Sequence, residues 1–133
     1  MSHKAPTFDD MVSRVRNLRT FKVKGIQGVM VCVRVSKKKT CASGHYSSRR
    51  RRMVVTFCKK ETDNWEVLLH EFTHAYMDLK FDSMDHGFAY KMTLCHAVSE
   101  FTGVPFVFLG SNDMRDLDVG ACKHIETFYV NKR

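Results

Sequence analysis

The chain has 133 residues and a formal net charge of +8 at pH 7, from 22 Lys or Arg and 14 Asp or Glu. A chain of this length forms one hydrophobic core, so residues 1–133 are expected to be a single domain. It contains no run of the ~18–20 apolar residues that a membrane helix needs, and its first residues lack the apolar centre of a signal peptide. We therefore expect a monomer that is cytoplasmic, or nuclear in a eukaryote, not secreted and without a membrane partner.

The first predicted element is a helix that begins at Thr7. Asp9 and Asp10 fall in its first turn, where carboxylates favour the positive end of the helix dipole. Apolar residues between Phe8 and Leu18 recur at helical spacing and predict its buried stripe. Two glycines further along the chain mark a break before the next element.

Three predicted strands follow this break. In residues 29–35, valines alternate with other side chains, which is the pattern of a strand buried on one face. Shorter strands at about residues 41–46 and 52–57 continue the pattern, with basic turns between them. We expect the three strands to form a small antiparallel sheet.

Residues 70–74, His-Glu-Phe-Thr-His, match the H-E-x-x-H metallopeptidase signature. Residues four apart lie on one face of a helix, so His70 and His74 can offer two imidazole nitrogens to one metal ion. Glu71 lies one step round the helix and is the candidate general base that acts on water. The motif therefore predicts a catalytic zinc site with Glu71 as the catalytic residue.

An amphipathic helix is predicted around this motif. Its apolar side chains follow the i, i+3, i+4 pattern of a buried stripe and are Trp65, Leu68, Leu69, Phe72, Ala75, Tyr76 and Leu79. Asp63 followed by Glu66 matches a capping box, which starts the helix about two turns before the first histidine.

A catalytic zinc needs a third protein ligand and a fourth position for water. His86 is the first choice, because it follows a polar turn and opens the next amphipathic segment, from which it can fold back over the motif. His96, in the middle of that segment, is the alternative ligand. Asp78, one turn after His74, is a candidate to orient a ligand imidazole. The other histidines fit surface or loop positions better and are His3, His45 and His124.

The last predicted element is a helix closed by Gly103 as its C-terminal cap. Its apolar stripe consists of Phe88, Met92, Cys95, Val98 and Phe101. The elements together predict an α+β fold in which three helices pack on a small antiparallel sheet. Residues 104–133, an apolar run and a mixed tail, match no pattern and are an unassigned C-terminal extension.

The charge is distributed unevenly along the chain. Residues 34–60 hold ten basic side chains and no acidic one. Such a block favours a polyanionic partner; single-stranded or disrupted duplex DNA is the partner expected once the family resemblance described below is added. The candidate nucleic-acid-binding residues are Lys37, Lys38, Lys39, Arg49, Arg50, Arg51 and Arg52.

The motifs in combination resemble the SprT-like metallopeptidase domain, the family of the Spartan proteases that act on DNA–protein crosslinks. The matching pieces are residues 67–76, the His-Gly-x-x-aromatic segment at residues 86–90 and the glycine-containing segment around Gly44. The resemblance extends over residues 8–103, and the chain lacks the paired C-x-x-C zinc ribbon of many bacterial members. It implies a zincin-like core, a Zn²⁺ cofactor and a role in DNA repair, with DNA-bound or crosslinked protein as the substrate.

The expected mechanism is hydrolysis of a peptide bond by water that is activated at the zinc ion, with Glu71 taking the proton. Tyr90, Tyr46 and His45 are candidates to stabilise the oxyanion, and the sequence does not choose among them. Two alternatives stay open. One is a non-proteolytic zinc-containing adaptor or inhibitor that binds nucleic acid or an acidic protein. The other is a metallopeptidase with no dependence on nucleic acid.

Overall fold

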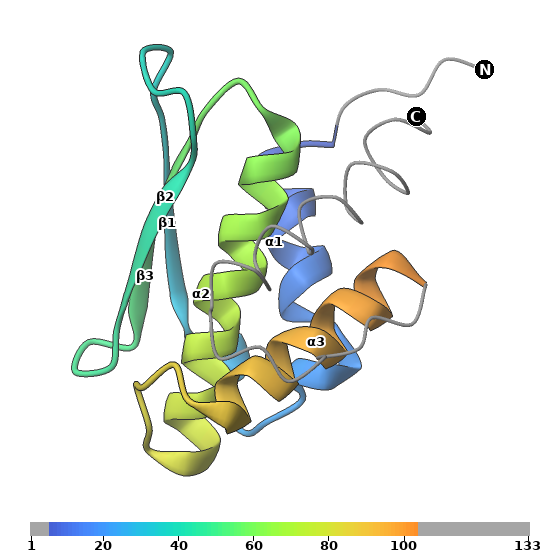
Figure 1. Cartoon of the computed structure of the whole chain (residues 1–133). Helices are drawn as coiled ribbons and strands as arrows, with labels where there is room; N and C mark the ends of the chain where they lie inside the picture. Colours follow the sequence, from blue (N-terminus) through green and yellow to red (C-terminus); the bar gives the residue numbers. More distant parts are fainter. Residues whose placement is uncertain (1–5, 104–133) are drawn as a thin grey trace.

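The computed structural model describes residues 6–103, so the expectations for His3, His124 and residues 104–133 lie outside the described residues. Within residues 6–103, the chain forms three α-helices and a three-stranded sheet (Figure 1). The elements in chain order are α1 (Phe8–Arg16), the 3-10 turns η1 (Arg19–Phe21) and η2 (Ile26–Gly28), β1 (Met30–Val35), β2 (Ser43–Ser47), β3 (Arg52–Phe57), α2 (Glu61–Phe81) and α3 (Phe88–Thr102). The predicted α+β class is confirmed.

The sheet is mixed, so the prediction of an antiparallel sheet is wrong. The strand order is β1-β3-β2, with β2 antiparallel to β3 and β1 parallel to β3. The chain reverses direction between β1 and β2 and again at the tight turn between β2 and β3. These two reversals return β3 to the direction of β1, and β1 pairs with the side of β3 that the hairpin leaves free. Alternating burial is the same in either arrangement, so the pattern of valines does not distinguish them.

All three helices lie on one side of the sheet, and α2 is the central element of that layer (Figure 1). It contacts α1, α3, β2 and β3. The core between the two layers includes several large side chains with almost no exposed surface: Phe21, Tyr46, Met53, Phe57, Leu68, Leu69, Phe72, Tyr90 and Phe101. In the described part of the chain, no helix has the length and apolar character required to span a bilayer.

Helix α1 begins where the sequence predicts. The Thr7 hydroxyl accepts a hydrogen bond from the backbone N–H of Asp10 at 3.1 Å, which satisfies a donor in the first turn. Met11, Val12 and Val15 are buried as expected. Phe8 is 42% exposed and packs edge-on against the Phe57 ring at 5.1 Å, at the margin of the core.

The expected capping box of α2 is absent from the structure. The helix begins at Glu61, with Lys60 as its N-cap and no side-chain capping bond, so Asp63 and Glu66 lie inside the helix. The buried Asn64 side chain instead accepts from the Cys58 N–H and donates to the Cys58 carbonyl, both at 2.9 Å. These two bonds tie the first turn of α2 to the end of β3, which satisfies both backbone groups away from water.

Helix α3 ends at the predicted cap and buries most of the predicted stripe. Gly103 has a φ of 72° and donates its N–H to the Ser99 carbonyl at 2.9 Å, which confirms the C-terminal signal. Phe88 is 69% exposed, so the stripe predicted from it is wrong at its first position. Cys95, Val98 and Phe101 of the predicted stripe are buried, and Tyr90, Leu94 and Ala97 are buried beside them. Burying this face turns Tyr90 toward α2.

The carboxylate of Glu100 connects α3 to η1. It accepts hydrogen bonds from the backbone N–H groups of Arg19 at 2.6 Å and Thr20 at 2.8 Å, and from the Thr20 hydroxyl at 2.9 Å. Partial burial alone would raise the pKa of Glu100. The bonds from Thr20 and Arg19 outweigh this effect and lower the pKa below its usual value.

We predict that Glu100→Gln lowers the free energy of unfolding by about 1 kcal/mol at pH 7, because an exposed charge-assisted network contributes modestly. A carboxylate with a lowered folded-state pKa stabilises the protein above its unfolded pKa and loses this effect as the pH falls through the folded pKa. The two proteins should therefore converge in stability in the acid range. Urea unfolding followed by circular dichroism at several pH values tests this, and a difference that is constant with pH would contradict it.

Candidate metal centre

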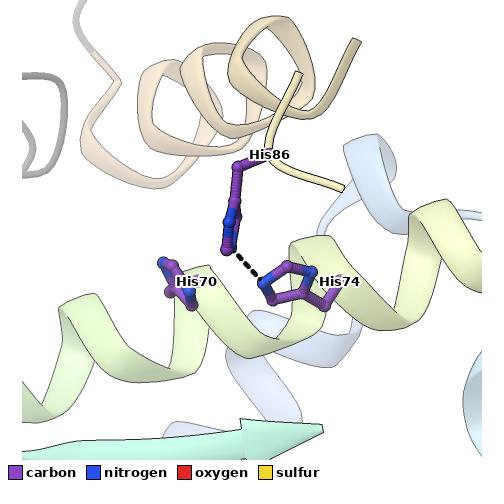
Figure 2. Close-up of side chains that lie close together, drawn as sticks. All are labelled: His70, His74 and His86. Carbon is purple, nitrogen blue, oxygen red and sulfur yellow. Dashed lines mark hydrogen bonds between the residues drawn. The ribbon is translucent and has the colours of Figure 1, made fainter. Parts of the chain in front are cut away.

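Three histidines converge above the middle of α2 (Figure 2). His70 and His74 lie one turn apart on the same face of the helix. His86 belongs to the loop before α3, and its Nε2 lies 2.7 Å from the Nε2 of His74. The candidate ligand atoms of all three residues lie within 4.8 Å of one another. The structure thus brings together the three histidines that the sequence singled out, close enough to hold a metal ion.

The donor set fits a tetrahedral metal ion after small adjustments of the imidazoles. Zinc–nitrogen bonds of ~2.0–2.1 Å place two tetrahedral ligand atoms about 3.3 Å apart. The contact between His74 and His86 is shorter than this, so a bound ion requires these two rings to separate slightly. Three nitrogen donors leave one tetrahedral position for water or substrate, which is the arrangement of a catalytic site.

The protonation states of the two helix histidines also suit a metal site. Burial lowers the pKa of His70 to about 4, with a smaller effect from His86. Burial likewise lowers the pKa of His74 to about 3, and electrostatic effects of the neighbouring His70 and His86, and a smaller one of His45 on β2, add to this. Both imidazoles are therefore neutral at pH 7, which is the form that ligates metal ions.

The loop that carries His86 is held by its neighbour Asp85. Its Oδ1 accepts the Gly87 N–H at 2.8 Å, and its Oδ2 accepts the Ser83 hydroxyl at 3.1 Å. A Cβ at Gly87 would lie 2.8 Å from the same Oδ1, which is closer than side-chain atoms approach. Gly87 has a φ of −73°, which any residue can adopt, so its lack of a side chain matters here only by leaving room for the Asp85 carboxylate.

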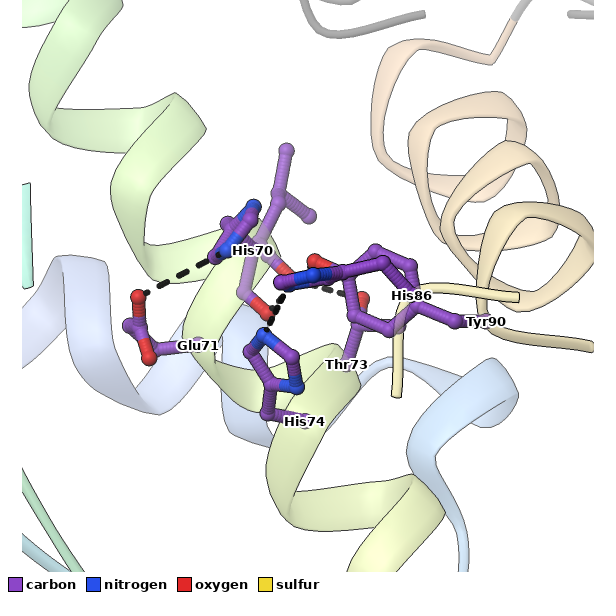
Figure 3. A network of polar contacts seen from close by, with 7 residues as sticks. His70, Glu71, Thr73, His74, His86 and Tyr90 are labelled. Atoms are coloured by element: carbon purple, nitrogen blue, oxygen red, sulfur yellow. Dashed lines mark hydrogen bonds and ion pairs between the residues drawn. The ribbon is translucent and has the colours of Figure 1, made fainter. Parts of the chain in front are cut away.

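Tyr90 supports the three imidazoles from within the core (Figure 3). Its ring centroid lies 4.6 Å from that of His74, 4.9 Å from that of His86 and 5.5 Å from that of His70. The hydroxyl donates to the His70 carbonyl at 3.2 Å, and the side chain is fully buried. The ring contacts orient the three imidazoles. The Tyr90 hydroxyl, a candidate to stabilise the oxyanion, is already used in the hydrogen bond to His70.

The other two oxyanion candidates are also placed by the structure. The buried Tyr46 donates its hydroxyl to the carboxylate of Asp78 at 2.7 Å. His45 is exposed on β2, and its neighbours Gly44 and Tyr46 face α2, so His45 lies on the opposite face of the strand. Both tyrosine hydroxyls therefore make hydrogen bonds inside the protein.

Asp78, the expected orienting residue, and His96, the alternative third ligand, do not contact the cluster. Asp78 accepts the Tyr46 hydroxyl, while the buried Nδ1 of His74 has no hydrogen-bond partner within residues 6–103. The prediction that Asp78 orients a ligand imidazole is therefore wrong in this structure. His96 is exposed on α3 and lines a separate cavity with Glu100 and Arg19, which excludes it from the cluster.

Glu71 lies beside the histidines in a buried position (Figure 3). Its Oε2 is 3.8 Å from the Nε2 of His70, and 5% of the residue is exposed. Burial raises the pKa of Glu71 to about 7, against a smaller opposing effect of a hydrogen bond from the Tyr46 backbone. A carboxylate with this pKa is suited to take up and release a proton near neutral pH.

Gly44 is a site residue whose role the sequence pattern did not reveal. A Cβ at this position would lie 2.9 Å from both the Cγ of Glu71 and a methyl carbon of Val67. The backbone of β2 can therefore pack directly on α2 beside Glu71 only because position 44 has no side chain. An isolated glycine within a strand pattern is the signal for such a close approach.

The predicted nucleic-acid-binding residues fall into two separate groups. Residues 37–39 follow β1, whereas residues 49–52 form the turn between β2 and β3 and the first residue of β3. Since β1 is parallel to β3, the end of β1 and the start of β3 lie at opposite ends of the sheet. The basic block is continuous in sequence but divided in space.

Comparison with known proteins found no match among family models, curated proteins or solved structures.

We predict that the full chain binds one divalent ion and that His86→Ala removes it as completely as His74→Ala. Each change deletes one of three converging nitrogen donors. His96→Ala serves as the control, because His96 lies outside the cluster, and it should retain the metal. Elemental analysis after gel filtration measures the metal per chain. Full retention by His86→Ala would remove His86 from the site.

We predict that Gly44→Ala lowers the free energy of unfolding by about 1–3 kcal/mol, because its Cβ overlaps Glu71 and Val67. Gly28→Ala is the matched control, since a Cβ at Gly28 meets nothing within 4 Å. Thermal unfolding followed by circular dichroism compares the two variants. Equal melting temperatures for both would show that β2 does not depend on the close approach at Gly44.

Proposed function

We propose that the protein is a zinc-dependent metallopeptidase that acts on DNA-associated or DNA-crosslinked proteins. The observation that carries the proposal is the buried Glu71 beside three converging histidines. A metal site with a purely structural role needs no general base, and burying a carboxylate without such a role costs folding free energy. The combination therefore favours hydrolysis over structural metal binding.

Zinc is the metal that this donor set suits best. Three imidazole nitrogens with an open fourth position are the ligands of catalytic zinc in several hydrolases. His70, His74 and His86 would hold the ion. When bound, it would polarise a peptide carbonyl and make water more acidic.

The protein's own residues supply proton transfer and orientation. Glu71 would accept a proton from the attacking water and pass it to the departing amine, and its pKa of about 7 permits both transfers near neutral pH. Tyr90 holds the imidazoles through its ring contacts and its hydrogen bond to His70. Gly44 allows β2 to lie directly against Glu71.

The free edge of β2 is the proposed binding site for an extended peptide. Within the described residues, β2 pairs with no strand other than β3, so its second edge is open to another strand beside α2, where the Tyr46 backbone also makes a hydrogen bond to Glu71. A substrate strand that adds to this edge would run past Glu71 and the histidine cluster. The zincin-like character of the fold is part of this proposal and rests on the resemblance of the motifs to SprT-like domains.

Nucleic acid enters the proposal through that resemblance and through the basic groups at the two ends of the sheet. The proposed substrate is therefore protein that is held on DNA. The alternative, a zinc-containing adaptor or inhibitor without proteolysis, would use the same basic surfaces and would not require Glu71 to be ionisable.

We predict that Glu71→Gln keeps the fold and the metal but loses at least ~10²-fold in peptidase activity, because the amide cannot take a proton. Asp63→Asn is the control, as it makes the same chemical change two turns earlier on α2. Cleavage of a DNA-bound protein and of a free peptide would be measured with and without DNA.

These measurements separate the candidate functions. Undiminished cleavage by Glu71→Gln would contradict the proposed mechanism. Absence of cleavage by the metal-loaded wild type under every condition would favour the adaptor, and cleavage that is indifferent to DNA would favour a peptidase without a nucleic-acid partner.

A further inference from the structure

The outer face of the sheet carries a small basic cavity on the β2–β3 hairpin. All helices of the described residues lie on the other side of the sheet, so none of them covers this face (Figure 1). The cavity has a volume of about 280 Å³. It is lined by His45, Ser47, Arg50, Arg52 and Val54.

The pairing of the strands explains why these side chains meet. His45 is opposite Val54, and Ser47 is opposite Arg52, in the antiparallel register of β2 and β3. Directly opposed residues project from the same face of a sheet, with Cβ atoms about 4.5–5.5 Å apart. Arg50 joins them from the turn, where its backbone N–H donates to the Ser47 hydroxyl oxygen at 3.3 Å. The cavity is therefore built on a fixed hairpin.

The donors of this cavity match an oxyanion. The two guanidinium groups, the imidazole and the hydroxyl can all donate hydrogen bonds, and guanidinium binds phosphate with two parallel bonds. Within residues 6–103, no carboxylate forms an ion pair with Arg50 or Arg52, which leaves their charge available to a ligand. Arg49 and Arg51, although adjacent in sequence, do not line the cavity.

A second cavity adjoins the first, because Arg52 lines both. It has a volume of about 680 Å³ and includes the exposed Met30 and the half-buried Cys32 of β1. On its far side, Arg16 donates to the carbonyls of Ile26, Gln27 and Val29 at 2.9–3.2 Å, which fixes that wall. This hollow next to a phosphate site can take an unstacked base, whose flat face can lie against Met30 and whose polar edge can meet Gln27 or Arg52.

We propose that the cavity of His45, Ser47, Arg50 and Arg52 binds a backbone phosphate of single-stranded nucleic acid, with the neighbouring base in the hollow beside Met30. The strand would thus lie on the opposite face of the sheet from the histidine cluster. The inference rests on the nucleic-acid part of the proposed function and names the residues that would carry it. Two of the four consecutive arginines would bind the phosphate specifically, and the other two would contribute charge alone.

The test compares two double variants of the full chain that remove the same charge. R50Q/R52Q removes the arginines of the cavity, and R49Q/R51Q removes the two arginines that do not line it. Binding of a fluorescent single-stranded oligonucleotide of ~15 nucleotides, a length that covers typical site sizes, is measured by anisotropy across a salt series. This readout needs no peptidase activity, so its failure is distinguishable from failure of the metallopeptidase proposal.

We expect R50Q/R52Q to bind the oligonucleotide about tenfold more weakly, because the variant loses the charge-assisted hydrogen bonds of the two arginines to one phosphate. Its log–log salt slope should fall by about 0.7 for each phosphate that is no longer neutralised, whereas R49Q/R51Q should bind only about twofold more weakly. Inorganic phosphate should displace the oligonucleotide from the wild type better than chloride at equal ionic strength. An abasic strand of the same length should bind more weakly than the oligonucleotide with bases.

Equal weakening in the two double variants would overturn the proposal, because it would show that only the total charge matters. Phosphate no better than chloride as a competitor would exclude a phosphate site. Binding to phosphoinositide vesicles without binding to the oligonucleotide would assign the cavity to a membrane surface instead and overturn the nucleic-acid partner. If R50Q/R52Q unfolds by circular dichroism, Arg50→Gln alone, at an exposed turn position, replaces it in the same comparison with Arg49→Gln.

Discussion

The rest of this structure depends on one constraint: two ionisable side chains in the middle of α2 are buried away from water. Glu71 and His74 are both buried in a helix whose remaining inward side chains are largely apolar. Such burial is expensive for a charged group, so both residues shift toward their neutral forms. The surroundings follow from this requirement: β2 packs on Glu71 without a side chain at Gly44, and the Tyr90 ring lies against the imidazoles.

The same burial that costs stability sets the protonation states of the candidate metal site. A carboxylate whose pKa is near neutrality exchanges protons more readily at physiological pH than an ordinary glutamate. Neutral imidazoles are ready to ligate a metal without first losing a proton. The buried Nδ1 of His74 has no hydrogen-bond partner within residues 6–103, so no such bond offsets the cost of removing this atom from water there.

The sheet divides the molecule into two chemically different faces. Its inner face packs on the helices and supports the histidine cluster, whereas its outer face presents the cavity of His45, Ser47, Arg50 and Arg52. The period of two along a strand produces this division, since neighbouring residues of β2 alternate between the faces. Gly44 and Tyr46 accordingly belong to the metal side, and His45 and Ser47 to the basic side. A single short strand therefore takes part in both candidate sites.

The sequence alone determined those features that depend on local periodicity: the helix around His70, Glu71 and His74, the position of β3, and the end of α3 at Gly103. Spacing along one helix is enough to place two imidazoles on one face. Tertiary structure decided the rest, because it depends on which segments pack together. The tertiary structure pairs β1 in parallel with β3 and separates the lysines of residues 37–39 from the arginines of residues 49–52. It also starts α2 at Glu61, where the Asn64 side chain binds the backbone of Cys58. Local patterns are compatible with several such packings, and only long-range contacts distinguish them.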